Sequence, residues 1–211
     1  MNKSQLKEKA KAILNGYSLG HIFDSSSSEY KFLCRIFQGH PEFAIKVGSG
    51  IKSIYTGVGE VYKTRCFFID RTDGTYTDIS YIRSIDGACS KISDIKCACR
   101  SAIQPVIDDF RSTVIFGVDT CSFTGELLVQ QNTHIDHYDL TFNDLVDLWL
   151  KPLNIDSLHS LLNDSTKDNE TKIYFLAEEI VNGFIAFHNE HTHLRAVSKT
   201  ANLSTLKKKG R

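Results

Sequence analysis

The sequence predicts an α+β protein, because helical and strand-like periodicities occupy separate parts of the chain. Blocks with hydrophobic residues three or four positions apart flank a block rich in β-branched and aromatic residues that alternates with a period of two. A length of 211 residues suits one large domain or two small ones, and 41% hydrophobic with 24% charged residues are ordinary globular values. We therefore expect a folded chain with a substantial core.

The pattern over residues 12–86 predicts a small α+β unit, preceded by a short helix. The expected elements are helices over 3–16 and 30–37 and strands over 51–55, 61–69 and 75–81. Asn15-Gly16 ends the first helix, and Gly39-His40-Pro41 ends the second. Asp73-Gly74 lies between the last two strands and is a dipeptide typical of hairpin turns.

The second half predicts helices separated by short strands. The expected elements are helices over 90–111, 142–150, 173–191 and 202–209 and strands over 114–118 and 126–135. Thr141 and Asp144 resemble a capping box at the start of one helix, and the polar stretch 163–171 predicts a loop. We expect the strand over 126–135 to form a hairpin with the one before it.

The zero net charge hides an asymmetry along the chain. Residues 1–100 hold 15 basic and 10 acidic side chains, whereas residues 101–211 hold 10 and 15. From Arg195 onward there are six basic side chains and no acid. A basic terminus is usually a solvated, frayed end. Because the charge is unevenly distributed, the zero total charge excludes only a uniformly basic nucleic-acid-binding protein.

The sequence shows no signal for export or membrane insertion. No run approaches the ~18 apolar residues of a membrane span, and the start of the chain lacks the apolar core of a signal peptide. Six cysteines in such a chain indicate reduced core residues or metal ligands rather than disulfides. We expect a cytoplasmic protein, and without a Cys-x-x-Cys pair a zinc knuckle lacks its usual spacing.

Three side chains that could bind a metal or transfer a proton lie at the end of the strand expected over 126–135. They are His134, Asp136 and His137. Adjacent residues of a strand face opposite sides, so Asp136 could hold a metal while His137 addresses another group. A second polar stretch, 188–202, follows the long helix and ends at Asn202. His188 and His191 in it are expected to decorate the exposed end of that helix.

Together these stretches resemble the HNH (ββα-metal) endonuclease motif. The matching positions are Asp136-His137, then His193-Leu194, then Asn202 nine residues after His193, leading into a basic helix. The resemblance implies hydrolysis of phosphodiester bonds with one cation. It makes His137 the general base, Asp136 and Asn202 the metal ligands, and His193 a residue that orients the site. Oxygen ligands favour Mg²⁺ or Mn²⁺.

The sequence departs from that family at two places. Many members carry a zinc knuckle, of which only Cys121 remains, because Thr124, Ser198 and Ala201 stand at the other cysteine positions. We therefore expect no structural zinc. The middle residue of the motif is His193, where the family most often has Asn.

The resemblance gives the basic C-terminus a role in contacting phosphates. The expected nucleic-acid contacts are His134, Arg195, Lys199, Lys207, Lys208 and Lys209. Double-stranded DNA is the expected partner and RNA the alternative; no membrane is involved, and a homodimer stays open. A protein of this kind acts in the bacterial cytoplasm or in a phage-infected cell.

The first half resembles the DCL (DUF3223-type) family. The resemblance rests on separated blocks in order: Phe37 to Ile51, including His40-Pro41-Glu42-Phe43, then Arg65 to Phe68, Arg71 to Thr75, and Asp78 to Tyr81. The family occurs in plant organelle rRNA-maturation proteins, in a plant RNA polymerase subunit and in phage and bacterial proteins, which implies association with nucleic acid.

The two resemblances predict a domain scheme and a function. A DCL-like domain (1–89) and a connecting helix (90–111) precede an HNH domain (112–211) with a helical insertion (142–191). The pairing suggests a homing-type or restriction-like endonuclease. The alternatives are a non-catalytic DNA- or RNA-binding protein with a degenerate HNH fold, and a metal-dependent enzyme on another substrate, which the basic tail argues against.

Overall fold

The chain folds into two compact units of mixed helix and strand. The structure is a computed structural model that describes residues 1–59, 63–164, 166, 168, 170 and 172–206. One unit comprises residues 1–90 with 164–172, and the other comprises 91–163 with the chain from 173 onward. The α+β class predicted from the sequence is confirmed.

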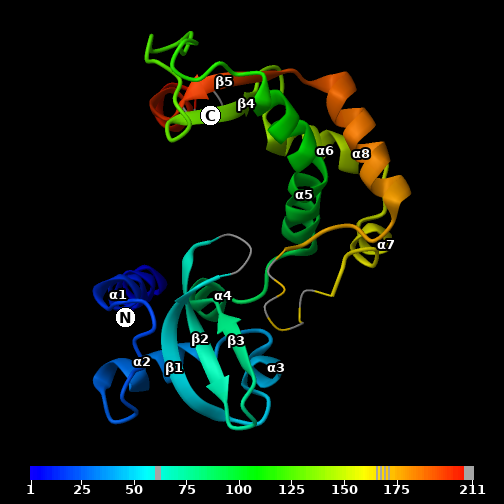
Figure 1. Ribbon diagram of the computed structural model, residues 1–211. Coiled ribbons are helices and arrows are strands. Elements are labelled where there is room, and N and C mark those ends of the chain that lie inside the picture. Colours follow the sequence, from blue (N-terminus) through cyan, green and yellow to red (C-terminus); the bar gives the residue numbers. More distant parts are fainter. Residues whose placement is uncertain (60–62, 165, 167, 169, 171, 207–211) are drawn as a thin grey trace. The chain divides into compact units, whose positions relative to one another are not determined.

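The described residues of the first unit form a three-stranded antiparallel sheet with four helices (Figure 1). Its elements are α1 (Lys3–Gly16), α2 (Ser28–Phe37), α3 (Phe43–Val47), β1 (Ile51–Val58), β2 (Arg65–Arg71), β3 (Tyr76–Ile79) and α4 (Tyr81–Asp86). Strand order is β1-β2-β3, and Gly74 takes a positive φ of 88° in the β2–β3 turn, as the Asp-Gly signal predicts. The short helices α3 and α4 were not predicted, because five or six residues show too little periodicity.

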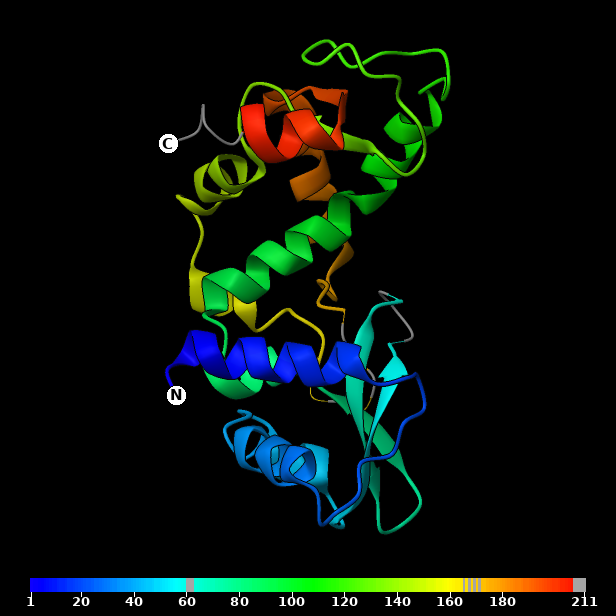
Figure 2. The same ribbon diagram turned by 90° about the vertical axis from the view of Figure 1, so that its left-hand side faces the viewer.

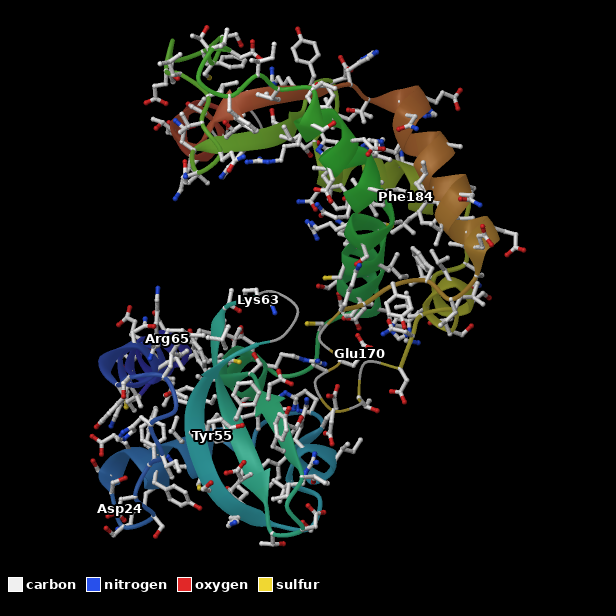
Figure 3. The ribbon with its side chains drawn as sticks, in the orientation of Figure 1. Asp24, Tyr55, Lys63, Arg65, Glu170 and Phe184 are labelled. Atoms are coloured by element: carbon white, nitrogen blue, oxygen red, sulfur yellow. The ribbon has the colours of Figure 1, made fainter. Side chains whose placement is uncertain are left out.

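Helices α1 and α2 lie against one face of this sheet (Figures 1 and 2). Buried side chains of both helices meet the inward face of the strands, where Phe37, Phe67 and Ile69 are fully buried. Arg65 of β2 donates to the carbonyl oxygens of Leu14 and Tyr17 at the end of α1 (Figure 3). Apolar burial and these bonds fix the helices on the sheet.

The second unit consists of helices and a two-stranded antiparallel sheet. Its elements are α5 (Lys91–Ser112), β4 (Thr133–His137), α6 (Phe142–Leu150), α7 (Ile155–His159), α8 (Glu178–His191), β5 (Leu194–Ser198) and the short π-helix η1 (Ala201–Thr205). The expected connecting helix is α5, which packs along α8 within this unit (Figure 1). Phe184 of α8 is fully buried there and lies against Trp149 (Figure 3). No described helix is long and apolar enough to cross a membrane.

The strands expected over 114–118 and 126–135 are largely wrong. Asp119 accepts a hydrogen bond from the amide of Ile115 and Gly117 takes a positive φ of 82°, so this segment is a turn. The side chain of Asn132 forms hydrogen bonds with the backbone of Val129 and Leu127, which holds residues 127–132 in a turn. Strand β4 therefore begins only at Thr133. The partner of β4 is β5, which the sequence did not predict.

Candidate functional site

The ladder between β4 and β5 positions the residues of the predicted motif. Asp136 lies directly opposite Arg195, and His137 opposite Leu194. Arg195 donates from Nε and Nη2 to Oδ2 of Asp136 at 2.9 and 2.7 Å. Its guanidinium also lies over the rings of Phe123 and Tyr138, 4.8 Å from each centroid. A cation held between two aromatic rings therefore neutralises Asp136.

The helix that follows β5 returns to the same face of β4. Asn202 of η1 donates from Nδ2 to Nδ1 of His134 at 2.8 Å. His134 and Asp136 are two residues apart on the strand and face the same side. The order strand, strand, helix thus places His134, Asp136 and Asn202 on one side of the ladder.

His137 faces the opposite side of β4, toward the helices. Its Nε2 lies 3.1 Å from Nε2 of His188 on α8, and its ring is 5.7 Å from that of Phe142. His188 is 1% exposed. The expectation that His188 decorates an exposed helix end is wrong, because β4 packs on that end of α8.

The hydrogen bonds define which ring nitrogens carry protons. Nδ1 of His188 lies 3.0 Å from Oδ1 of Asn189, which can only accept, so His188 is protonated on Nδ1. When both rings are neutral, Nε2 of His188 therefore carries no proton and accepts a hydrogen bond from Nε2–H of His137. The unprotonated ring nitrogen of His137 is then Nδ1. Burial of the ring and the neighbouring His188 lower the pKa of His137 to about 4. The imidazole is therefore neutral at physiological pH.

The remaining predicted residues occupy separate places. His193 is exposed and its Nδ1 lies 2.7 Å from Oδ2 of Asp139, and none of its described contacts reaches His137. Lys199 is exposed after β5, where its amide donates to the carbonyl of Asn132. The predicted contacts Lys207, Lys208 and Lys209 lie outside the described residues.

The four positions that correspond to the zinc knuckle of the HNH family converge in space. Cys121 is 1% exposed and shares a small buried cluster with Ala201. Thr124 Oγ1 and Ser198 Oγ lie 3.0 Å apart. Burial raises the pKa of the Cys121 thiol, but hydrogen bonds from Ser198 and Thr124 outweigh it and lower the pKa to about 6. Hydroxyls and a methyl group stand where the resemblance places thiolates.

The side of β4 that carries Asp136 offers two oxygen donors of the kind that a hard cation takes. Arg195 binds Oδ2 of Asp136, and the other carboxylate oxygen takes no hydrogen bond from the described residues. Asn202 uses its nitrogen on His134, which leaves its amide oxygen for a ligand. Carboxylate and amide oxygens suit Mg²⁺ or Mn²⁺. Among described residues no group of three or more His, Cys, Asp or Glu side chains is placed to hold a metal, so water and substrate would have to complete the coordination.

Two curated proteins are similar to part of this chain. DNA-directed RNA polymerase IV subunit 1 of Arabidopsis thaliana is 28% identical over 95 residues, which are 45% of this chain and 6% of that protein. Protein EMBRYO DEFECTIVE 514 of the same plant is 39% identical over 51 residues, 24% of this chain and 25% of its own. The chain thus spans a quarter or less of these relatives.

One solved structure and one family model also match. The solution NMR structure of an uncharacterized protein from Rhodospirillum rubrum is 30% identical, with 39% of this chain and 77% of that chain covered and a TM-score of 0.35. The family is described as "Protein of unknown function (DUF3223)" and matches residues 11–85. That match ends before the second unit, which holds the nuclease resemblance. Residues 11–85 of the chain are a DUF3223 domain.

Proposed function

We propose that the chain is a metal-dependent DNA endonuclease whose reaction takes place on the β4–β5–η1 segment. The observation that carries the proposal is the hydrogen bond between Asn202 and His134, which brings η1 onto the face of β4 that carries Asp136. Asp136 and Asn202 thereby lie on one face of β4, and His137 is the next residue of the same strand, directed to the other face. The convergence of Cys121, Thr124, Ser198 and Ala201 supports the same resemblance independently.

Asp136 and Asn202 would hold a Mg²⁺ or Mn²⁺ ion through their oxygen atoms. When bound, such an ion supplies charge neutralisation at the phosphate and at the leaving oxygen. Arg195 balances the charge of Asp136 and lies where a phosphate could draw its guanidinium away from that carboxylate. Binding of substrate would then free Asp136 for the ion.

His137 would accept the proton of the attacking water at Nδ1. Its neutral state at physiological pH makes the lone pair available, and the bond to His188 fixes the ring. His193 would act through Asp139 on the strand end rather than on His137. Arg195 and Lys199 supply positive charge beside the site.

Two observations support nucleic acid as the substrate class. One relative of part of this chain is a DNA-directed RNA polymerase subunit, and its name states a nucleic-acid template. In the second unit, Arg195 with Phe123 and the 62% exposed Tyr138 combines positive charge with aromatic rings, a combination that suits phosphates and bases. Duplex DNA is the proposed substrate, and RNA is tested beside it.

The test is cleavage of supercoiled plasmid and of labelled RNA by wild type and His137→Ala, with Mg²⁺, Mn²⁺ or EDTA. We expect nicking by wild type that EDTA abolishes and that His137→Ala reduces by at least ~100-fold. His191→Gln is the matched control, because this histidine of α8 stacks on Phe187 and has no described contact with His137 or His188. Equal nicking by wild type and His137→Ala would refute the role of His137.

The second candidate is a nucleic-acid-binding protein without catalysis. The ion pair between Arg195 and Asp136 favours it, because a bound guanidinium competes with a divalent cation for the carboxylate. Retardation of DNA in a gel, without cleavage in the presence of any of the metals, would establish this candidate and exclude the nuclease function.

A further inference from the structure

The DUF3223 domain contains a buried arginine whose side chain the domain itself holds in place. The side chain of Arg71, at the end of β2, is 6% exposed. Its Nε donates to the carbonyl of Lys46 at 3.0 Å, its Nη2 to the carbonyl of Ile45 at 3.3 Å, and its Nη1 to Oγ1 of Thr75 at 3.0 Å. Gly48 makes room for it, because a Cβ there would lie 3.0 Å from Cδ of Arg71.

These bonds use three of the five N–H groups of the guanidinium. The other two, one on each Nη, point together into a shallow hollow of about 400 Å³. They donate to the two carboxylate oxygens of Asp168 at 2.6 Å each. Two parallel N–H groups held in a fixed orientation match a carboxylate or a phosphate group.

We call the two parallel N–H groups of Arg71 the Arg71 fork. The residue that the fork binds comes from outside the DUF3223 domain. The family match covers residues 11–85, whereas Asp168 belongs to the segment 164–172, nearly 100 positions along the chain from Arg71. The side chain of Asp168 is 41% exposed, so it caps the hollow from the solvent side. The domain therefore builds an anion site from its own residues, and a distant carboxylate fills that site.

We propose that Arg71 is a phosphate-binding site for a nucleic-acid strand, and that Asp168 occupies it as an internal competitor. A phosphodiester has two oxygens that can replace the carboxylate oxygens on the same two N–H groups. Lys46, whose Nζ lies 3.2 Å from Asp78, adds positive charge beside the fork, and Asp73 at the rim is already bonded to Thr75. Nucleic acid must displace Asp168 to reach Arg71, so Asp168 lowers the affinity of the free chain. This proposal does not depend on catalysis by the second unit.

The experiment measures binding of the full chain to a labelled 20-base-pair duplex and to the matching single strand, in EDTA so that no cleavage occurs. Asp168→Asn removes the competing charge and keeps the shape of the side chain. Glu170→Gln is the matched control, because Glu170, labelled in Figure 3, lies two positions from Asp168 and is not among the described partners of Arg71. We expect Asp168→Asn to tighten binding about fivefold or more and Glu170→Gln to change it less than about twofold.

The salt dependence supplies a second readout. One additional phosphate contact steepens the slope of log K against log salt by about 0.9 for duplex DNA, and this change is expected for Asp168→Asn alone. Adding Arg71→Lys to Asp168→Asn should cancel the gain, because an ammonium lacks the planar fork. The comparison of Asp168→Asn with Glu170→Gln stands even where Arg71→Lys destabilises the domain.

Three results would overturn the proposal. The first is equal tightening by Asp168→Asn and Glu170→Gln, which would mean a general charge effect. The second is no tightening by either variant. The third is thermal stabilisation of Asp168→Asn by inorganic phosphate without tighter binding of either oligonucleotide, which would make Arg71 a site for small anions only.

Discussion

The DUF3223 domain should lose stability in mild acid through one buried histidine. His40 follows α2, is 5% exposed, and accepts a hydrogen bond on Nδ1 from the amide of Glu42 at 3.1 Å. Burial of the ring, with Arg83 and Lys46 nearby, lowers the pKa of His40 from 6.5 to about 4. The folded domain therefore holds this ring neutral, whereas the unfolded chain protonates it near pH 6.5.

The direction and size of the effect follow from proton linkage. Between pH 6.5 and pH 4 the unfolded state binds more protons than the folded state, so stability is complete above pH 6.5 and falls as the pH drops through this range. A pKa of about 4 against 6.5 corresponds to about 3 kcal/mol in the free energy of unfolding. Most of it should be lost by pH 4.5.

The assay compares wild type with His40→Asn in urea denaturation at pH 7 and pH 4.5. Asparagine keeps an acceptor for the amide of Glu42 but does not titrate. Hydrogen exchange of β2 amides reports the first unit, and Trp149, the single tryptophan, reports the second. Between pH 7 and pH 4.5, the free energy of unfolding reported by the β2 amides should fall by about 2 to 3 kcal/mol more in wild type than in His40→Asn. The free energy reported by Trp149 should fall equally in the two proteins. Equal losses in the two proteins would refute the role given to His40.

Three further predictions concern the second unit. His188→Gln should slow cleavage at least about tenfold with unchanged DNA affinity, because the ring of His137 is then no longer held by His188. Equal cleavage rates would contradict a role of His188 in positioning His137. Phe184→Ala should cost about 3 to 5 kcal/mol and shift the unfolding transition of Trp149, since Phe184 is fully buried; a loss below about 1 kcal/mol would contradict its place in the core. Completing a four-cysteine site should give one bound zinc per chain and a higher Tm with zinc, whereas no zinc binding would show that the positions do not converge. That variant replaces Thr124, Ser198 and Ala201 by Cys beside Cys121.

Elements governed by neighbouring residues could be predicted from the sequence. Helix α1 has the predicted bounds because Asn2 and Gln5 form a capping box at its start and it ends at Gly16. The Thr141 cap of α6 was also identified from its spacing with Asp144. Such signals lie within a few positions of the element that they end or begin.

Features that depend on distant contacts could not be predicted. Strand β5 has five residues, and its partner β4 lies some 60 positions earlier, so neither length nor local pattern marks it. The burial of His188 arises only when β4 packs on α8. The pairing of Arg71 with Asp168 lies within the first unit but joins residues 97 positions apart, and no local pattern marks it.

The central claim is that Asp136 and Asn202 hold the ion that hydrolysis requires. The most direct test is the nicking rate of supercoiled plasmid as a function of Mg²⁺ concentration for wild type, Asp136→Asn and Asn202→Ala. The account predicts that wild type saturates, that Asn202→Ala requires at least about tenfold more Mg²⁺ for half of its maximal rate, and that Asp136→Asn is inactive. Superimposable curves for the three proteins, or no Mg²⁺-dependent nicking by wild type, would contradict it.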